Sequence, residues 1–109
     1  MSVAVRTRRF SVAEYRKMVQ AGILKEDDRV ELIEGAIVEM VPIGPHHAVC
    51  VHRLNQYFNR LVGDRAIVGV QSPISLGPYS EPQPDLALLR PPLGRYAESH
   101  PRPEDLFKV

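Results

Sequence analysis

The sequence contains one cysteine, no tryptophan and no excess of charge of either sign. A single cysteine, Cys50, excludes a disulfide within the chain and is typical of a reducing compartment. The 14 basic and 13 acidic side chains leave a formal net charge of +1, so any binding of nucleic acid must come from a local patch. No apolar run approaches the ~20 residues of a membrane span, and the arginines of MSVAVRTRRF follow a short apolar piece, the reverse of a secretory signal. These absences predict a cytoplasmic protein.

Several catalytic and metal-binding patterns are also missing. No spacing of Cys and His resembles a zinc site, and HHAVCVH (46–52) lacks the glutamate of the helical metalloprotease pattern. The chain has no glycine-rich phosphate loop and no nucleophile elbow. We expect Cys50 to pack in the core rather than to act as a nucleophile. The tyrosines are scattered, so they predict no array for stacking on bases.

Near the start, the residues carry the pattern of a capped helix. Ser11 and Glu14 have the spacing of a capping box, in which each side chain bonds the other residue's backbone amide. Phe10 and Tyr15 stand at the spacing of a hydrophobic staple, and Gly22 is a natural C-terminal stop. The pattern predicts a helix that begins after Ser11 and ends before Gly22.

Two further segments have a clear period. Residues 30–40 alternate apolar and polar positions on either side of an EG pair, which predicts a β-hairpin. Its apolar positions are Val30, Leu32, Ile37 and Met40. Residues 44–63 have helical period and end at a glycine. The expected apolar stripe of this central helix consists of Ala48, Val51, Leu54, Phe58 and Leu61.

The rest of the chain adds strands but no domain boundary. RAIVGVQ (65–71) predicts a strand, and SPISLGPYSEPQP (72–84) predicts a proline-rich connection with at most one short strand. DLALLR (85–90) is nearly continuously apolar, which is typical of a strand covered on both faces, and a loop follows over 91–105. With 44% hydrophobic residues in 109, we expect one domain over 1–109 of the α/β class. Its specific form is α+β, a mixed sheet flanked by helices.

Asp85 stands at the entry of this apolar strand. An ionised carboxylate there must be paired, hydrogen-bonded or bound to a cation, because desolvation alone is costly. It is therefore either a strand-entry residue that caps a backbone amide or a ligand of a cation. Glu31 and Glu34 in the hairpin are either part of a solvated face or, in the case of Glu31, a metal ligand. A hard divalent ion takes oxygen ligands from separate elements, and Glu31 and Asp85 could supply two of them.

Basic residues give a weak signal for nucleic acid. His46 and His47 open the central helix, where a histidine is often only a polar residue, and adjacent histidines cannot both face one site. One basic cluster precedes the first helix, and it is either a solvated arm or a phosphate clamp. Its members are Arg6, Arg8 and Arg9. The polar side of the central helix extends the cluster if the faces align. The candidates there are Arg53 and Arg60.

Three stretches taken together resemble one known family. RFSVAEYRKMVQAGIL (9–24), DRVELIEGAIVEMVPIGPHH (28–47) and EPQPDLALLR (81–90) occur in this order. The set is similar to the Uma-type family of restriction endonucleases, which is widespread in bacteria and belongs to the PD-(D/E)XK nuclease superfamily. The resemblance runs from about Arg9 to the end of the chain. It implies a mixed sheet flanked by helices and hydrolysis of DNA phosphodiesters with Mg²⁺ or Mn²⁺.

The resemblance also implies roles for three residues. Asp85 matches the metal-binding aspartate of the family, and Glu31 matches the acidic residue contributed by the first hairpin. His47 matches a histidine that the family often carries at the head of the helix. The implied catalytic set is therefore Asp85, Glu31 and His47, with the two carboxylates on the metal. In such a site the metal lowers the pKa of a bound water and stabilises charge on the phosphate.

The end of the sequence departs from the family pattern. In the family, a strand with a second metal carboxylate and then a lysine follows the aspartate, whereas this sequence ends at LFKV and Lys108 precedes the missing carboxylate. We therefore expect a truncated, inactive chain that forms the N-terminal part of the fold. The uncovered apolar edge of 85–90 predicts a homodimer or larger assembly. Two other interpretations stay open, a non-enzymatic remnant that oligomerises and a small nucleic-acid-binding module.

Overall fold

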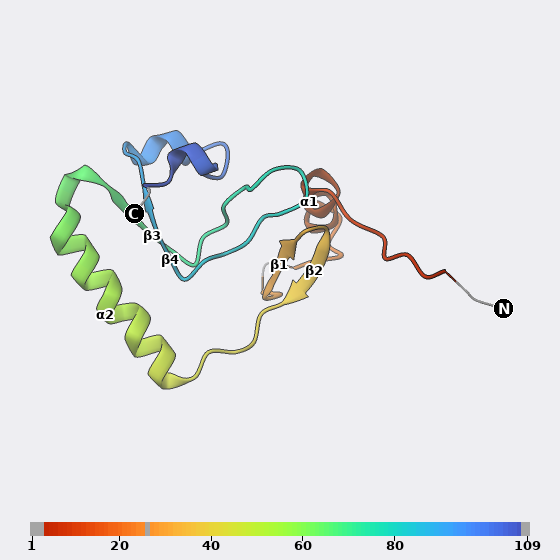
Figure 1. Cartoon of the computed structure of the whole chain (residues 1–109), viewed down its shortest axis with the longest axis horizontal. Coiled ribbons are helices and arrows are strands. Elements are labelled where there is room, and N and C mark those ends of the chain that lie inside the picture. The colour runs from red at the N-terminus through yellow and green to blue at the C-terminus, as the bar shows by residue number, and fades with distance from the viewer. Residues whose placement is uncertain (1–3, 26, 108–109) are drawn as a thin grey trace.

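Figure 1 shows the computed structural model, which describes residues 4–25 and 27–107. In chain order the elements are α1 (Val12–Gln20), β1 (Val30–Ile33), β2 (Ala36–Glu39), α2 (Pro45–Val62), η1 (Gly63–Arg65), β3 (Ile67–Val70), β4 (Leu86–Leu89), η2 (Leu93–Tyr96) and η3 (Pro103–Asp105), where η marks a 3₁₀ helix. The expected α+β class is confirmed. The described strands form two small antiparallel sheets, β1–β2 and β3–β4, instead of one mixed sheet. Within the same ranges, no helix has the length and apolar character needed to cross a membrane.

Helix α1 begins and ends as its sequence predicts. The Glu14 amide donates to Ser11 Oγ at 3.1 Å, and the Ser11 amide donates to Glu14 Oε1 at 3.0 Å. The capping box is therefore complete. Beyond the C-cap residue Ala21, Gly22 takes the left-handed conformation with φ of 78°, which favours glycine and stops the helix.

The hairpin turns at Glu34 and Gly35, whose φ values of 47° and 85° are both left-handed, as a two-residue turn of type I′ requires. Leu32 pairs with Ile37 across the hairpin and is fully buried. It forms the core cluster with Val12 and Tyr15 of α1. The partly buried residues packed against this cluster are Phe10, Leu24, Val30 and Ile37. The apolar alternation of the hairpin thus builds the main core of the first half of the chain.

In the second half, α2 packs against β3 with only part of the expected stripe. Val51 is the one buried residue of this helix, whereas Leu54 and Leu61 are 41% and 52% exposed. Cys50 is exposed as well, so its expected place in the core is wrong. A two-stranded sheet is too narrow to cover the whole apolar side of an 18-residue helix, and this leaves the outer part of the stripe in solvent.

Strand β4 is less covered than its apolar sequence predicts. It pairs with β3 in an antiparallel register in which Val70 faces Leu86 and Ile67 faces Leu89. Only Leu89 is buried, and the remaining residues of the strand are half-buried. The other edge of β4 is partly occupied by the returning chain, because Phe107 N donates to Leu88 O at 3.0 Å and Leu106 bridges to Leu89.

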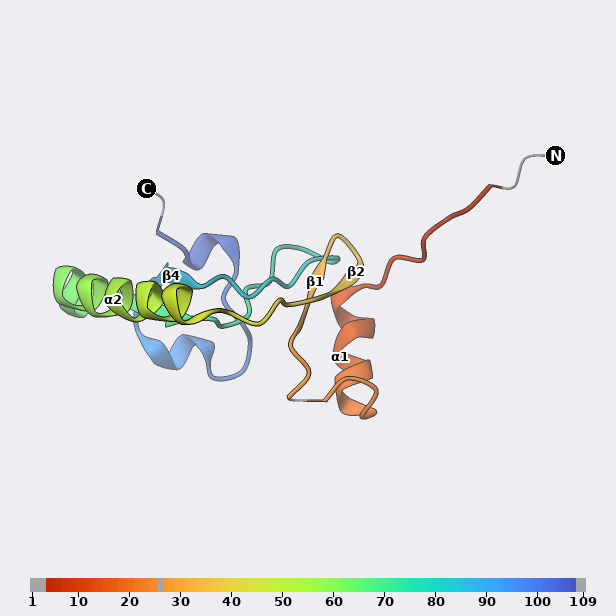
Figure 2. The same cartoon turned by 90° about the horizontal axis from the view of Figure 1, so that it is seen from below.

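The connection 71–85 links β3 to β4 and also contacts the hairpin, so it joins the half that contains α1 and the hairpin to the half that contains α2, β3 and β4. The molecule is elongated. Glu81 N donates to Leu32 O at 2.8 Å at the hairpin end, and Gln71 N donates to Asp85 O at 3.1 Å at the β3 end. Figures 1 and 2 show α1 and the hairpin on one side of the molecule and α2 on the other. The radius of gyration is 16.4 Å, against about 13 Å for a compact domain of this length.

Candidate functional site

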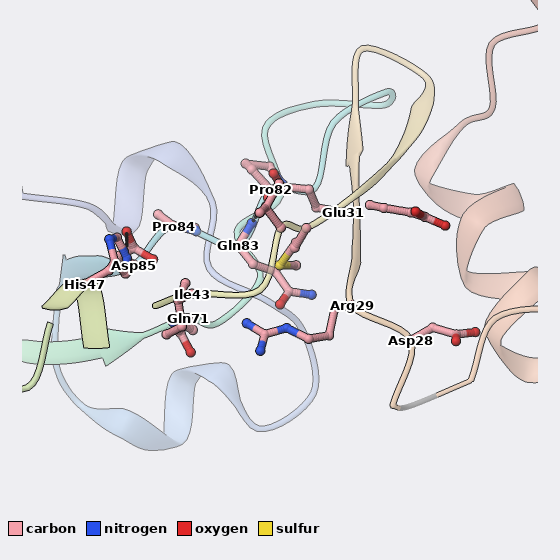
Figure 3. A pocket seen from close by; sticks show the side chains of 13 residues that line it. Asp28, Arg29, Glu31, Ile43, His47, Gln71, Pro82, Gln83, Pro84 and Asp85 are labelled. Atoms are coloured by element: carbon pink, nitrogen blue, oxygen red, sulfur yellow. Dashed lines mark hydrogen bonds and ion pairs between the residues drawn. The ribbon is translucent and has the colours of Figure 1, made fainter. Parts of the chain in front are cut away.

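A cavity of about 790 Å³ lies between the two halves (Figure 3). It is bordered by the hairpin, the start of α2, the end of β3 and the segment before β4. Its lining residues are Asp28, Arg29, Glu31, Glu39, Met40, Val41, Ile43, His47, Gln71, Pro82, Gln83, Pro84 and Asp85. The set includes all three residues for which the family resemblance implies a catalytic role.

Asp85 and His47 form a pair at one side of this cavity. The distance between His47 Nε2 and Asp85 Oδ2 is 3.1 Å, and the two side chains are 47% and 51% exposed. His47 lies in the first turn of α2, after Pro45 at the first helical position. Successive helix residues point about 100° apart, so His46 does not share this direction and does not line the cavity.

The pair has a definite chemical use. A carboxylate that bonds one ring nitrogen of a histidine fixes the orientation of the ring and leaves the other nitrogen to exchange a proton. The backbone of Asp85 is fixed as well, because its carbonyl oxygen accepts a hydrogen bond from the backbone amide of Gln71 at 3.1 Å. The fold thereby presents an oriented imidazole and a carboxylate at an open, water-accessible surface.

Glu31 reaches the cavity because of strand alternation. Leu32 points into the core, so Glu31 lies on the opposite face of β1. Its Oε2 accepts a hydrogen bond from the backbone amide of Gln83 at 2.8 Å. Glu31 is therefore joined to the segment that carries Asp85, two residues further along the chain.

The carboxylates of Glu31 and Asp85 are hard oxygen ligands of the kind that Mg²⁺ and Mn²⁺ prefer. Within residues 4–25 and 27–107, no three His, Cys, Asp or Glu side chains come close enough together to hold one ion. Mg²⁺ is commonly held by one or two carboxylates, with water and phosphate oxygens in the remaining positions. Because His47 already pairs with Asp85, the absence of such a trio among these described residues also means that Glu31 does not join Asp85 and His47 around one point, and Figure 3 shows Glu31 apart from that pair. Each carboxylate taken alone is a suitable ligand for a cation that also binds water and phosphate oxygens.

Several polar residues of the cavity have no role in the sequence prediction. They are Asp28, Arg29, Glu39, Gln71 and Gln83. Arg29 directly precedes β1, and its side chain extends toward Gln71 in Figure 3. Gln71 has a left-handed backbone with φ of 49°, which is uncommon for a residue other than glycine and is frequent at functional sites. No sequence pattern marks Gln71, and Arg29 has only its place beside the ELIEG motif.

The arginines expected to contact nucleic acid lie elsewhere. Arg8 Nη2 pairs with Glu14 Oε2 at 2.7 Å, and the Arg9 guanidinium stacks on Tyr79 with 4.1 Å to the ring centroid. The Ser11 backbone amide, followed by the Ser11 side chain and Arg8, holds the pKa of Glu14 below its ordinary value. None of the described arginines Arg6, Arg8, Arg9, Arg53 and Arg60 lines the cavity. Their contact with nucleic acid stays a prediction.

A second polar cluster joins α1 to the connection, and the sequence did not point to it. Glu81 is 4% exposed, and its Oε2 accepts hydrogen bonds from Arg16 at 2.9 Å and Ser75 at 3.2 Å. His100 Nε2 lies 3.7 Å from Glu81 Oε1. Such a buried carboxylate needs these partners, and the cluster holds α1, the connection and the C-terminal loop together.

Comparison with known proteins identifies the family. No curated protein and no solved structure matches the chain. A family model named Uma2 and described as "Putative restriction endonuclease" matches residues 12–107, a span that holds the capped helix, the hairpin and the whole cavity lining. This chain, with its restriction-endonuclease-like α+β fold, therefore belongs to the Uma2 family.

Proposed function

We propose that the chain is a DNA endonuclease of the restriction-endonuclease type that works with Mg²⁺ or Mn²⁺ at the cavity between the hairpin and α2. This proposal replaces the expectation of an inactive chain, because all three residues of the implied catalytic set line that cavity. One observation carries the proposal. Glu31, His47 and Asp85 come from three separate stretches of sequence, and all three line one open cavity. The family description supports the same chemistry, hydrolysis of a DNA phosphodiester.

Each residue has a role that follows from its position. Glu31 and Asp85 would hold the cation, which, when bound, polarises the phosphate and makes a bound water more acidic. His47 contacts Asp85 and keeps that carboxylate in place at the head of α2. The Gln83 amide does the same for Glu31. The open mouth admits a phosphodiester, whose oxygens complete the coordination that the described side chains leave incomplete.

The test is cleavage of supercoiled plasmid DNA with Mg²⁺, Mn²⁺ or EDTA. We expect nicking with either metal and none with EDTA. Asp85→Asn and Glu31→Gln, which keep side-chain size but remove a charged ligand, should each lower the rate by at least about a hundredfold, as loss of a group that stabilises transition-state charge does. Glu104→Gln, an exposed carboxylate outside this cavity, is the matched control. Equal rates for all four proteins, or cleavage that persists in EDTA, would refute the proposal.

A second function is favoured by one observation, the exposed apolar side of α2. Val49, Leu54, Tyr57 and Leu61 are all more than 40% exposed. A chain that associates through this helix and does not cleave DNA would be an assembly module. Wild-type protein that forms a stable homodimer and leaves DNA intact with both metals would support this alternative.

A further inference from the structure

The cavity has an excess of negative charge, although its proposed substrate is a polyanion. Among the described residues, its lining carries four carboxylates, which belong to Asp28, Glu31, Glu39 and Asp85. Against them stands one permanently charged cation, Arg29, together with His47. DNA phosphates are repelled by uncompensated carboxylates. A substrate phosphate therefore needs a favourable contact inside the cavity. Of the lining residues that the structure describes, Arg29 is the one that always carries positive charge.

The backbone of Arg29 is fixed while its guanidinium is free within the described part of the chain. Met40 N donates to Arg29 O at 2.7 Å, which extends the hairpin ladder by one residue beyond Val30 and Glu39. The guanidinium makes no hydrogen bond or ion pair with any residue in 4–25 and 27–107. By contrast, several other arginine side chains donate hydrogen bonds to residues of the chain. They include Arg8, Arg9, Arg16, Arg65, Arg90 and Arg95.

Arg29 lines the same cavity as the three proposed catalytic residues. In Figure 3 its guanidinium extends from the start of β1 toward Gln71 and lies between Glu31 and the pair of His47 and Asp85. Gln71 is tied to Asp85 through its backbone amide, and its left-handed backbone sets the direction of an amide side chain that also donates hydrogen bonds. A planar guanidinium binds two phosphate oxygens at once.

We propose that Arg29 is the substrate-binding residue that holds a DNA phosphate in this cavity, with Gln71 as a second donor. The inference rests on the proposed function, because it assigns the substrate contact of the same site. Arg29 offsets the charge of the surrounding carboxylates and orients the phosphodiester toward Glu31, His47 and Asp85. It binds any sequence, since a phosphate contact carries no base information.

The experiment measures binding separately from cleavage. Fluorescence anisotropy of a short labelled duplex is followed over a salt series with Ca²⁺, a hard cation of more flexible geometry than Mg²⁺. The variants are Arg29→Gln and Arg29→Lys. Lys17→Gln, which removes one exposed positive charge on α1 outside the cavity, is the matched control. Circular dichroism verifies that each variant is folded.

We expect Arg29→Gln to weaken binding on the order of tenfold, as loss of a charged hydrogen bond does. It should also reduce the slope of log affinity against log salt by about 0.9, the value for one phosphate contact. Arg29→Lys should keep the slope and lose part of the affinity, because an ammonium cannot bind two oxygens in the plane of a fork. Lys17→Gln should bind like the wild type.

Two results would overturn the inference while the proposed function stands. One is unchanged affinity and slope in Arg29→Gln, and the other is an equal loss in Lys17→Gln, which would indicate a general charge effect. Wild-type protein that shows no salt-dependent binding of DNA would overturn the proposed function itself, and the role of Arg29 with it. The salt dependence of binding therefore distinguishes failure of the role of Arg29 from failure of the proposed function, whereas cleavage assays do not.

Discussion

Glu81 is a buried carboxylate that depends on hydrogen-bond partners from other parts of the chain. Its carboxylate is buried, and Arg16 is its closest charged partner at 2.9 Å. Removal of one partner leaves a buried acceptor with fewer hydrogen bonds. The Arg16 side chain is itself 49% exposed, so solvent screens part of the attraction.

We expect Arg16→Met to lower the free energy of unfolding by about 1–3 kcal/mol, the cost of an unsatisfied buried polar group. Arg8→Met, which breaks an exposed pair with Glu14, should cost less than about 1 kcal/mol. Urea unfolding followed by circular dichroism measures both. Equal losses in the two variants would show that the burial of Glu81 has no energetic weight.

At the residue scale, the sequence predicts what depends on near neighbours. Ser11 and Glu14 are three positions apart, and their capping box is present as expected. The burial of Glu81 was not predictable, because it arises from Leu32 and Arg16, which lie far away in the sequence. The exposure of Cys50 has the same origin, since it depends on how wide a surface the sheet offers to α2.

At the scale of single elements, the turn of the hairpin contains a glycine that has no room for a side chain. A Cβ atom at Gly35 would lie 2.6 Å from Arg9 Cβ and 3.0 Å from Arg9 Cα, and its φ is left-handed. Gly22 has a similar φ of 78° but no atom within 4 Å of its Cβ position. Substitution of Gly22 therefore tests backbone strain alone, whereas substitution of Gly35 tests strain together with steric contact.

We expect Gly35→Ala to destabilise the protein by about 3 kcal/mol, from left-handed strain together with overpacking against the Arg9 backbone. Gly22→Ala should cost about 1 kcal/mol, from strain alone. Thermal and urea unfolding of both variants provide the comparison. If Gly22→Ala is as damaging as Gly35→Ala, the contact with Arg9 contributes nothing.

Single helices and strands were predictable because the spacing of their apolar residues is visible within each stretch. The way in which they assemble was harder to predict. Helices α1 and α2 and the described strands β1 to β4 lie within the stretches that their apolar periods predict. The 3₁₀ helices η2 and η3 were not predicted, because they lie in the segment 91–105 that was expected to be a loop. The division into two sheets could not be predicted, since the pattern of β4 is the same whether it pairs with one strand or two. The half-buried state of β4 follows from that division.

At the scale of the whole molecule, the open shape leaves apolar surface on α2. The edge of β4, where we expected association, is partly occupied by Leu106 and Phe107. The exposed side chains of α2 are therefore the stronger basis for a homodimer, because apolar patches of this kind mark interaction sites. Leu54 and Leu61 are seven positions apart and lie on one side of the helix.

We expect the wild-type protein to show concentration-dependent association in sedimentation velocity. Leu54→Glu and Leu61→Glu should each shift it toward the monomer, because a charge cannot be buried in an apolar interface without a partner. Ile23→Glu, at a 68% exposed position after α1, is the control. A monomer at every concentration, or an equal shift in Ile23→Glu, would contradict association through α2.

At this scale the sequence predicted only part of the candidate site. Glu31 and Asp85 were candidates from the residue pattern, the family resemblance implied catalytic roles for them and for His47, and all three line one cavity. Arg29 and Gln71 line it too, but their presence depends on how the hairpin and β3 approach each other. A single sequence carries no local pattern that encodes this approach, so the place of Arg29 and Gln71 in the site became visible only in three dimensions.

The hydrogen bond from the Gln83 amide to Glu31 Oε2 at 2.8 Å makes one backbone proton a reporter for the cavity. While the carboxylate accepts it, this amide is shielded from exchange with solvent deuterium. A ligand that draws Glu31 away would release the proton, and the exchange of a single amide would quicken before any larger movement of the fold. The same proton would stay shielded if a ligand bound through Asp85 alone, so its exchange rate distinguishes which carboxylate is occupied.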